Sequence, residues 1–294
     1  MKYQPLALAW LLALISLCTS GVAAAAVVVR DDTGHAVNLP STPTRIISLA
    51  PGATEMLFAA GAGEHVIATV QYSDEPAAAK QVPRIGDVVA VDMERLVALR
   101  PEVAVVWPGG GNLAQIEEIG RMGIPLYRQQ VNVLADLPGS IRRLGALAGT
   151  SAIAEQAARN IEARLANLSQ AYGGGRHPSV LLQVWNHPIY TVGGTHLMSD
   201  ALRLCGARNV FGDLRDLGPA VDVEAVVARN PDIIVAAAPP GGGPEWLADW
   251  RRFTTLRAVR TGNLITFEDQ RLTRLGPSVV SATEALCKVL AAAH

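Results

Sequence analysis

The sequence predicts an α/β protein in which two Rossmann-like lobes are joined by one long rigid helix and enclose a ligand cleft. Two observations carry this prediction. One phrase occurs twice, as DMERLVALRPEVAVVW at 92–107 and as DVEAVVARNPDIIVAA at 222–237, and a long helical pattern separates the copies. The chain has 294 residues, 50% of them hydrophobic, which is enough for two cores. We expect a first lobe at 27–150, a connecting helix at 151–175 and a second lobe at 176–294.

Each copy of the repeated phrase begins as a short helix. Asp92 and Asp222 are suitable N-caps, because a short carboxylate accepts hydrogen bonds from the free amides of a first helical turn. Glu94 and Glu224 follow two residues later, where negative charge favours the helix dipole. From the residues alone, ordinary surface acids explain these two glutamates equally well.

Each copy then ends as a buried strand. Pro101 and Pro231 stop the helices, because a proline ring cannot occupy a helix interior. The runs 103–106 and 233–235 are rich in β-branched residues and are typical of strands buried on both faces. The spacing of the copies is too long for a solenoid, so we interpret them as two copies of one α/β lobe.

The other elements of both lobes alternate between strand and helix, as in parallel sheets with helices on both faces. After a turn at 31–34, we expect a strand at 45–49, a helix ending near Gly61, a strand at 65–70, the loop 71–76, the first phrase, a glycine-rich loop at 108–111, a helix and a strand around 124–127. In the second lobe we expect a strand at 179–185, the loop 186–190, a helix at 198–205, the second phrase, the loop 239–244, a helix with Trp246 and Trp250, a strand at 264–267 and a helix at 278–293. Ligands of open α/β sheets bind beyond the carboxyl ends of the strands, so the loops that follow strands should line the cleft.

The connecting helix is expected at 152–172. Ser151 is available as its cap and the glycines 173–175 as its stop. Apolar residues recur at helical spacing and form one stripe, made of Ile153, Ala157, Ile161, Leu165 and Leu168. A rigid helix of this length permits rocking of the lobes but opposes a wide hinge opening.

The first 26 residues have the layout of a secretory signal. Lys2 precedes an apolar stretch at 6–17 and small residues at 21–26, so we expect cleavage near Ala26 and a periplasmic mature protein. Two alternatives stay open: a single membrane anchor, for which the apolar stretch is short, and a lipoprotein anchored through Cys18.

Cleavage of that signal leaves two cysteines, Cys205 and Cys287, and an even number in an oxidising compartment predicts a disulfide. The bridge would link the last helix covalently to the rest of the second lobe and add roughly 3 to 5 kcal/mol to the free energy of unfolding. The alternative is two unpaired buried thiols.

Several classes of chemistry lack their motifs. The chain has no nucleophile elbow, no P-loop and no H-E-x-x-H helix, and its histidines are scattered, so neither an enzyme nor a resident metal is expected. The formal net charge is -1 and no basic stripe is present, so no nucleic-acid partner is expected.

Four aromatic residues fall at or just past strand ends, where cleft loops begin: Tyr72, Trp107, Trp185 and Tyr190. Flat rings at these places can stack on a large planar ligand, although each taken singly is as readily a packing residue. Trp246 and Trp250 are one helical turn apart and are assigned to packing. The glycines at 109–111 and 241–243 indicate either flexible loops or close backbone approach to a ligand.

Taken together, these stretches resemble the solute-binding proteins of ABC importers, in the class that has two lobes, one connecting helix and cobalamin, siderophores or haem as ligands. The stretches that carry the resemblance are RIISLAPGATEMLFAAGAG (45–63), YSDEP (72–76), MERLVALRPEVAVVWPGGGN (93–112), CGARNVF (205–211) and EAVVARNPDIIV (224–235). Within the class, the sequence is most similar to the cobalamin binders.

The resemblance implies roles for named residues. Tyr72, Trp107 and Tyr190 match aromatic pocket positions, and Asp269 and Arg274 fall in the last ligand-facing loop. Glu94 and Glu224 match two acids that pair with arginines of the permease, and Cys205 and Cys287 match a disulfide. The pattern departs from the cobalamin binders at two pocket tryptophans, where this chain has Val88 and Gly218.

The resemblance therefore implies a monomeric periplasmic protein with no cofactor of its own. It would capture a corrinoid, with cobalamin as the transported ligand, and deliver it to the transmembrane subunits of an ABC permease. Haem or a ferric siderophore is the alternative ligand within the class. An exported hydrolase is a remote alternative, because a paired nucleophile and base are not recognisable in the sequence.

Overall fold

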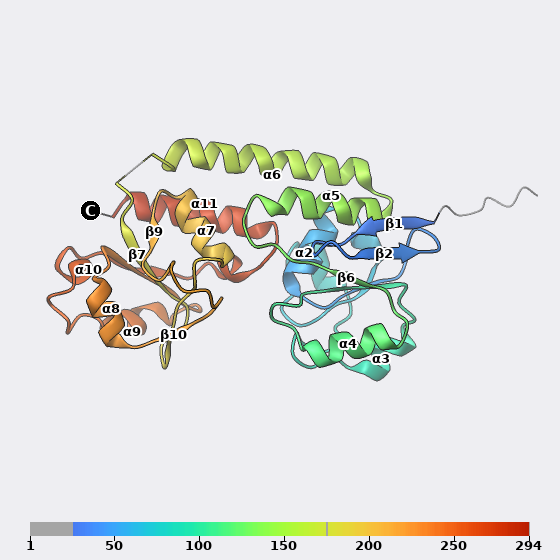
Figure 1. The fold of residues 1–294 in the computed structure, drawn as a ribbon, viewed down its shortest axis with the longest axis horizontal. Coiled ribbons are helices and arrows are strands. Elements are labelled where there is room, and N and C mark those ends of the chain that lie inside the picture. The colour runs from blue at the N-terminus through green and yellow to red at the C-terminus, as the bar shows by residue number, and fades with distance from the viewer. Residues whose placement is uncertain (1–25, 175, 294) are drawn as a thin grey trace, which may run out of the picture.

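The computed structural model describes residues 26–174 and 176–293 and has two α/β lobes side by side under one long helix (Figure 1). The predicted signal peptide and Cys18 therefore lie outside the described residues, apart from Ala26 at its end. No helix within the described part of the chain is both long and apolar enough to cross a bilayer.

The first lobe is built on a parallel sheet of four strands in the order β4-β3-β5-β6. A hairpin of β1 (Val27–Arg30) and β2 (Ala36–Leu39) precedes it around the expected turn. The sheet and its helices are β3 (Ile46–Ser48), α2 (Pro51–Ala59), β4 (Val66–Ala68), α3 (Met93–Ala98), β5 (Val103–Val106), α4 (Leu113–Arg121), β6 (Leu126–Arg128) and α5 (Asp136–Ala148). Short 3-10 turns occur at Gly63–His65 and Ala77–Gln81.

The second lobe repeats this plan with a parallel sheet in the order β12-β11-β7-β9. Its elements are β7 (Ser179–Gln183), β8 (Ile189–Tyr190), α7 (Leu197–Leu204), β9 (Arg208–Asn209), β10 (Ala220–Val221), α8 (Val223–Arg229), β11 (Ile233–Ala237), α9 (Gly243–Ala248), α10 (Arg257–Arg260), β12 (Leu264–Phe267), the 3-10 turn η3 (Gln270–Thr273) and α11 (Ser278–Ala291). Strands β8 and β10 form a small antiparallel pair beside the sheet.

The repeated phrase forms the same unit in both lobes. Asp92 accepts a hydrogen bond from the amide of Arg95 at 2.9 Å and caps α3, and Asp222 caps α8 in the same way. The strands that follow, β5 and β11, are fully buried and lie inside their sheets. Each helix ends before the proline because the preceding residue, Arg100 or Asn230, has a left-handed backbone with φ of 46° or 45°.

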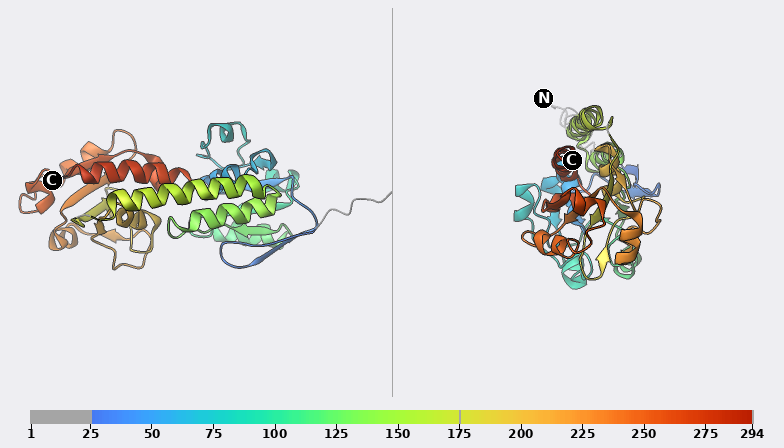
Figure 2. Two further views of the ribbon diagram at one scale, coloured as in Figure 1. Left: turned by 90° about the horizontal axis from the view of Figure 1, so that it is seen from above. Right: turned by 90° about the vertical axis from the view of Figure 1, so that its left-hand side faces the viewer.

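The connecting helix is α6 (Ser151–Tyr172), which spans both lobes along one face of the molecule (Figure 2). Two details of the prediction were wrong. Thr150, not Ser151, occupies the N-cap and makes no side-chain cap bond. Ile153 is 56% exposed and does not belong to the buried face of α6. Ile161 and Leu168 of the predicted stripe are buried together with Ala154 and Ala158, and the predicted Ala157 and Leu165 are partly buried against the same core.

Helix α5 was not anticipated, because Pro138 and Gly139 stand in its first turn and Gly145 interrupts its apolar pattern. The structure explains Gly145, since a Cβ at this position would lie 2.2 Å from the Cβ of Ala154 on α6. The glycine therefore permits the close packing of α5 on α6 that ties the connecting helix to the first lobe.

The predicted disulfide is confirmed. Cys205 follows α7 and Cys287 lies on α11, and their sulfurs are bonded across a sequence separation of 82 residues. Both residues belong to the buried core. The bridge joins the last helix of the chain to α7, as the sequence led us to expect.

Candidate ligand-binding site

A cavity of about 450 Å³ lies between the lobes, at the carboxyl ends of the first-lobe strands. The first lobe contributes residues that follow β3, β4, β5 and β6, and the second lobe contributes the segment from η3 to the start of α11. The lining residues are Ala50, Pro51, Gly52, Gln71, Tyr72, Val88, Trp107, Gln129, Gln270, Thr273, Arg274 and Leu275. The cavity thus contains Tyr72, Trp107 and Arg274 of the residues predicted to bind ligand.

A smaller space of about 200 Å³ adjoins this cavity through the shared residues Trp107 and Leu275. Its second-lobe wall comes from Thr195, His196 and Leu197 at the start of α7, with Leu217 from the following loop. The ring of Trp107 therefore lies between two parts of one interlobe cleft.

Tyr72 stands at the rim of the cleft and is 74% exposed. Its φ is 64°, a left-handed conformation that a tyrosine rarely adopts. The next residue holds the loop in place through a buried chain of hydroxyl groups: Ser48 to Thr54 at 2.8 Å, Thr54 to Thr69 at 2.7 Å, and Thr69 to Ser73 at 2.9 Å. The sheet thus fixes the backbone of an aromatic side chain that itself remains uncovered.

Trp107 directly follows β5 and rests on the glycine-rich loop. A Cβ at Gly110 would lie 2.0 Å from the indole ring, and one at Gly109 would lie 2.9 Å from Nε1. The absence of side chains at these glycines therefore leaves room for the indole of Trp107. This role differs from both expected ones, a flexible loop and close approach of the backbone to a ligand. In the second lobe, Gly243 similarly admits Thr266 of β12.

We expect Gly110→Ala to displace the indole and to weaken ligand binding about tenfold, roughly 1.4 kcal/mol, while the protein stays folded. Calorimetric titration of ligand together with the near-ultraviolet dichroism of tryptophan would measure this. Gly174→Ala is the matched control, because a Cβ there meets nothing within 4 Å and the backbone of Gly174 is not left-handed. Unchanged affinity in Gly110→Ala would contradict the assigned role of the loop.

The floor of the cleft is an interlobe contact with little space. A Cβ at Gly52, in the first turn of α2, would lie 2.6 Å from the backbone carbonyl of Leu275. The amide of Ser278 donates to Oε2 of Glu55 at 3.0 Å, and Oε1 of Glu55 lies 3.7 Å from Nη1 of Arg274. Burial raises the pKa of Glu55, while the hydrogen bond from Ser278 and the charge of Arg274 oppose the rise.

Trp185 and Tyr190 lie outside the cavity that Tyr72 and Trp107 share. They pair with each other across the turn that ends in β8, and the Trp185 ring meets Trp246 edge-on with centroids 6.1 Å apart. Trp185 is 53% and Tyr190 38% exposed, so their contact with a ligand stays a prediction. Trp246 and Trp250 are buried packing residues, as expected.

Asp269 and Arg274 have different positions, although both belong to the last loop. Asp269 accepts a hydrogen bond from the Arg271 guanidinium at 2.6 Å, which lowers the pKa of the Asp269 carboxyl, and it caps η3. It is not among the residues that line the cavity, whereas Arg274 is.

The sequence places His196 beside a probable cleft loop and favours an ordinary loop residue over a metal or haem-iron ligand; in the structure it lines the cleft as the N-cap of α7. Its Nδ1 lies 3.0 Å from the amide nitrogen of Met198. An amide can only donate, so Nδ1 accepts and Nε2 carries the proton of the neutral ring. Burial lowers the pKa of His196 to about 4. In this tautomer the His196 ring has a hydrogen-bond donor at Nε2 and no free lone pair.

This histidine makes stability depend on pH. The folded ring stays neutral while the unfolded chain takes up a proton below about pH 6.5, so the free energy of unfolding falls as the pH drops toward 4. We expect His196→Ser to reduce the loss between about pH 7 and about pH 4.5 by about 2 kcal/mol, measured by urea unfolding. The exposed His35→Ser variant is the control. Equal pH slopes for wild type and His196→Ser would contradict the assignment.

Glu94 and Glu224 are exposed in the first turns of α3 and α8. The two helices lie on the face of the molecule opposite α6, one on each lobe (Figure 1). Neither glutamate has an ion-pair partner among the described residues. The repeated phrase thus presents one uncompensated acid on each lobe.

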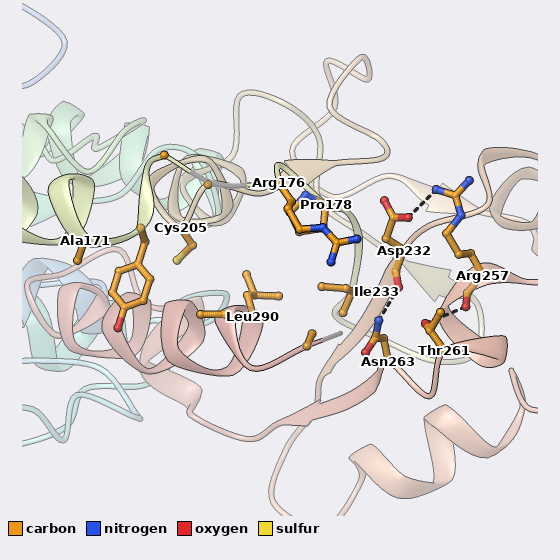
Figure 3. Close-up of a pocket in the computed structure, with 15 residues that line it drawn as sticks. Ala171, Arg176, Pro178, Cys205, Asp232, Ile233, Arg257, Thr261, Asn263 and Leu290 are labelled. Carbon is orange, nitrogen blue, oxygen red and sulfur yellow. Dashed lines mark hydrogen bonds and ion pairs between the residues drawn. The ribbon is translucent and has the colours of Figure 1, made fainter.

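A separate cavity of about 560 Å³ lies in the second lobe near the end of α6 (Figure 3). Tyr172, Ile233, Leu290 and the ion pair of Asp232 with Arg257 line it. Of the predicted site residues only Cys205 belongs to its wall, so it is not the predicted cleft. Within residues 26–174 and 176–293, no cluster of three or more His, Cys, Asp or Glu side chains could hold a metal ion.

Comparison with known proteins shows which family has this architecture. Residues 46–270 match the family model described as periplasmic binding protein. A protein named vitamin B12-binding protein from Photorhabdus laumondii is 31% identical over 255 residues, which cover 86% of this chain and 90% of that protein. The periplasmic vitamin B12 binding protein BtuF of Vibrio cholerae has a TM-score of 0.77 at 28% identity, over 86% of this chain and 98% of that one.

A periplasmic heme binding protein of Vibrio cholerae, HutB, has a TM-score of 0.71 at 18% identity and covers 84% of this chain and 98% of its own; this likeness concerns the fold alone. The family model, by contrast, spans both lobes and the connecting helix. The chain belongs to the periplasmic binding protein family.

Proposed function

We propose that this protein captures a corrinoid, with cobalamin as the natural cargo, in the cleft between its lobes and delivers it to an ABC importer permease. The observation that carries the proposal is the shared cavity of Tyr72, Trp107 and Arg274, in a chain about one-third identical to proteins named for vitamin B12. Two aromatic faces and one guanidinium suit a broad, flat, polar-rimmed macrocycle.

The work is binding, with no bond made or broken. The protein acts as a monomer in the periplasm after removal of its signal peptide near Ala26, and it carries no cofactor of its own. Glu94 and Glu224 dock the loaded protein on basic groups of the permease, one acid for each lobe. Trp185, Tyr190 and Asp269 complete the ligand contacts when the cargo fills the cleft beyond the enclosed cavity.

Haem is the main competitor for the cleft. The Nδ1 atom of His196 is occupied by the amide of Met198, so this histidine is a poor ligand for haem iron. That observation counts against His196 as the axial ligand of a haem iron.

The deciding experiment is a parallel calorimetric titration of the mature chain with cyanocobalamin, haem and a ferric hydroxamate. Tight one-to-one binding of cyanocobalamin alone is expected. If the protein does not bind cyanocobalamin but binds haem or the hydroxamate, the proposed ligand is wrong, whereas the family assignment still holds. Turnover of a model ester would overturn the assignment as a pure binding protein.

A further inference from the structure

The cleft contains a cation whose charge is already balanced. Arg274 belongs to the second lobe and is the only charged residue among those that line the 450 Å³ cavity. Its Nη1 lies 3.7 Å from Oε1 of Glu55, on α2 of the first lobe, and the side chains of Arg274 and Glu55 are only 18% and 4% exposed. A buried carboxylate is costly unless it is paired, so Glu55 and Arg274 form one neutral unit across the lobes.

The other polar groups of the cavity are neutral amides, chiefly Gln71, Gln129 and Gln270. Nε2 of Gln129 donates to the carbonyl of Leu275 at 3.2 Å, and Nε2 of Gln270 donates to the carbonyl of Ala238 at 2.8 Å. A carbonyl can only accept, so the atom that bonds to it must be the nitrogen Nε2, and the other atom of each side-chain amide is the oxygen Oε1. Oε1 of Gln129 has no hydrogen-bond donor among the described residues but is buried out of reach of a ligand, whereas Oε1 of the exposed Gln270 accepts from none of them.

A ligand edge that meets this wall finds the acceptor oxygen of Gln270 and a guanidinium whose charge is balanced. A primary carboxamide supplies N–H donors to such acceptors and a carbonyl to the guanidinium. A carboxylate supplies acceptors only and would face the Gln270 oxygen without the full charge of Arg274. The wall is therefore complementary to an uncharged amide rim.

We propose that Glu55 is a positioning residue that holds and neutralises Arg274, so that the cleft selects ligands with a carboxamide rim over ligands with a carboxylate rim. This inference rests on the proposed function and deepens it, because side-chain amides border a corrin and propionates border a haem. Gly276 supports the arrangement, since a Cβ there would lie 2.7 Å from Oε2 of Glu55.

The test compares cyanocobalamin with its monocarboxylate, in which one side-chain amide is hydrolysed, by calorimetry near neutral pH. Wild type should bind the amide form at least about tenfold more tightly. In Glu55→Gln the carboxamide still accepts from Ser278 but leaves Arg274 charged, so the ratio should fall below about threefold. Glu284→Gln removes one negative charge from α11, away from the cleft, and should keep the wild-type ratio.

The ratio separates positioning from a merely structural role, because a structural Glu55 would weaken both ligands equally. If Glu55→Gln does not fold, Gln270→Lys tests the same idea at an exposed position by adding a cation to the wall, and it should also narrow the ratio. Equal affinity of wild type for the two ligands, or an unchanged ratio in the folded variant, would overturn the inference. Failure of wild type to bind cyanocobalamin at all would instead overturn the proposed function, and the inference with it.

Discussion

The double variant Glu94→Lys/Glu224→Lys should lose ligand uptake through the permease and keep its ligand affinity within about twofold. The reason is geometric. Both acids are exposed and neither lines the cleft cavity; their helices lie one on each lobe, on the face opposite α6 (Figure 1). If the proposed docking holds, reversing both charges turns two attractive contacts with a basic partner into two repulsive ones, whereas the cavity is untouched.

Transport into vesicles that contain the cognate permease, with calorimetry on the same preparations, would measure both effects. The matched control is Glu162→Lys/Glu284→Lys, which changes the net charge equally on α6 and α11, and whose exposed ion pairs contribute little stability. Uptake that survives the first double reversal would remove the docking role from these glutamates.

The double variant Cys205→Ala/Cys287→Ala should unfold about 4 kcal/mol more easily than the oxidised wild type. The bond closes a loop of 82 residues, and the chain entropy that such a loop removes from the unfolded state is worth roughly that much. Loss of the bridge frees α11 from α7, although the cleft residues remain in place. Urea unfolding of both proteins measures the difference.

Reduced wild type is the control for the volume lost on replacing two buried sulfurs by alanine. Its free energy of unfolding should fall by nearly the same amount as that of the double variant. A difference below about 1 kcal/mol between oxidised and reduced protein would mean that the unfolded chain is already restricted without the bond.

The sequence predicted those parts of the fold that are determined by residues close together in the chain. Asp92 and Asp222 cap their helices through their own side chains, and the runs after Pro101 and Pro231 are buried strands. Tyr72 and Trp107 were found because each follows a parallel strand, and the carboxyl ends of such strands meet at one edge. These signals need only a few neighbouring residues.

The rest depends on contacts between distant segments. Glu55, Gln129 and Arg274 come together only when α2, the end of β6 and the last loop meet at the cleft floor. The same strand-end rule grouped Trp185 and Tyr190 with the cleft; they pair with each other outside the cavity of Tyr72 and Trp107, and their contact with a ligand stays a prediction. Helix α5 was missed because packing on α6 outweighs the low helix propensity of its glycines.

The close approach of Gly52 to the carbonyl of Leu275 has a kinetic consequence. The lobes already touch through main chain at the floor and are bound together by α6 along their backs, so the empty protein has little room to open or close before it meets a ligand. Association should then be a single encounter step, whose observed rate rises linearly with ligand concentration and does not level off. Discrimination between cargoes would be expressed in how long each one stays.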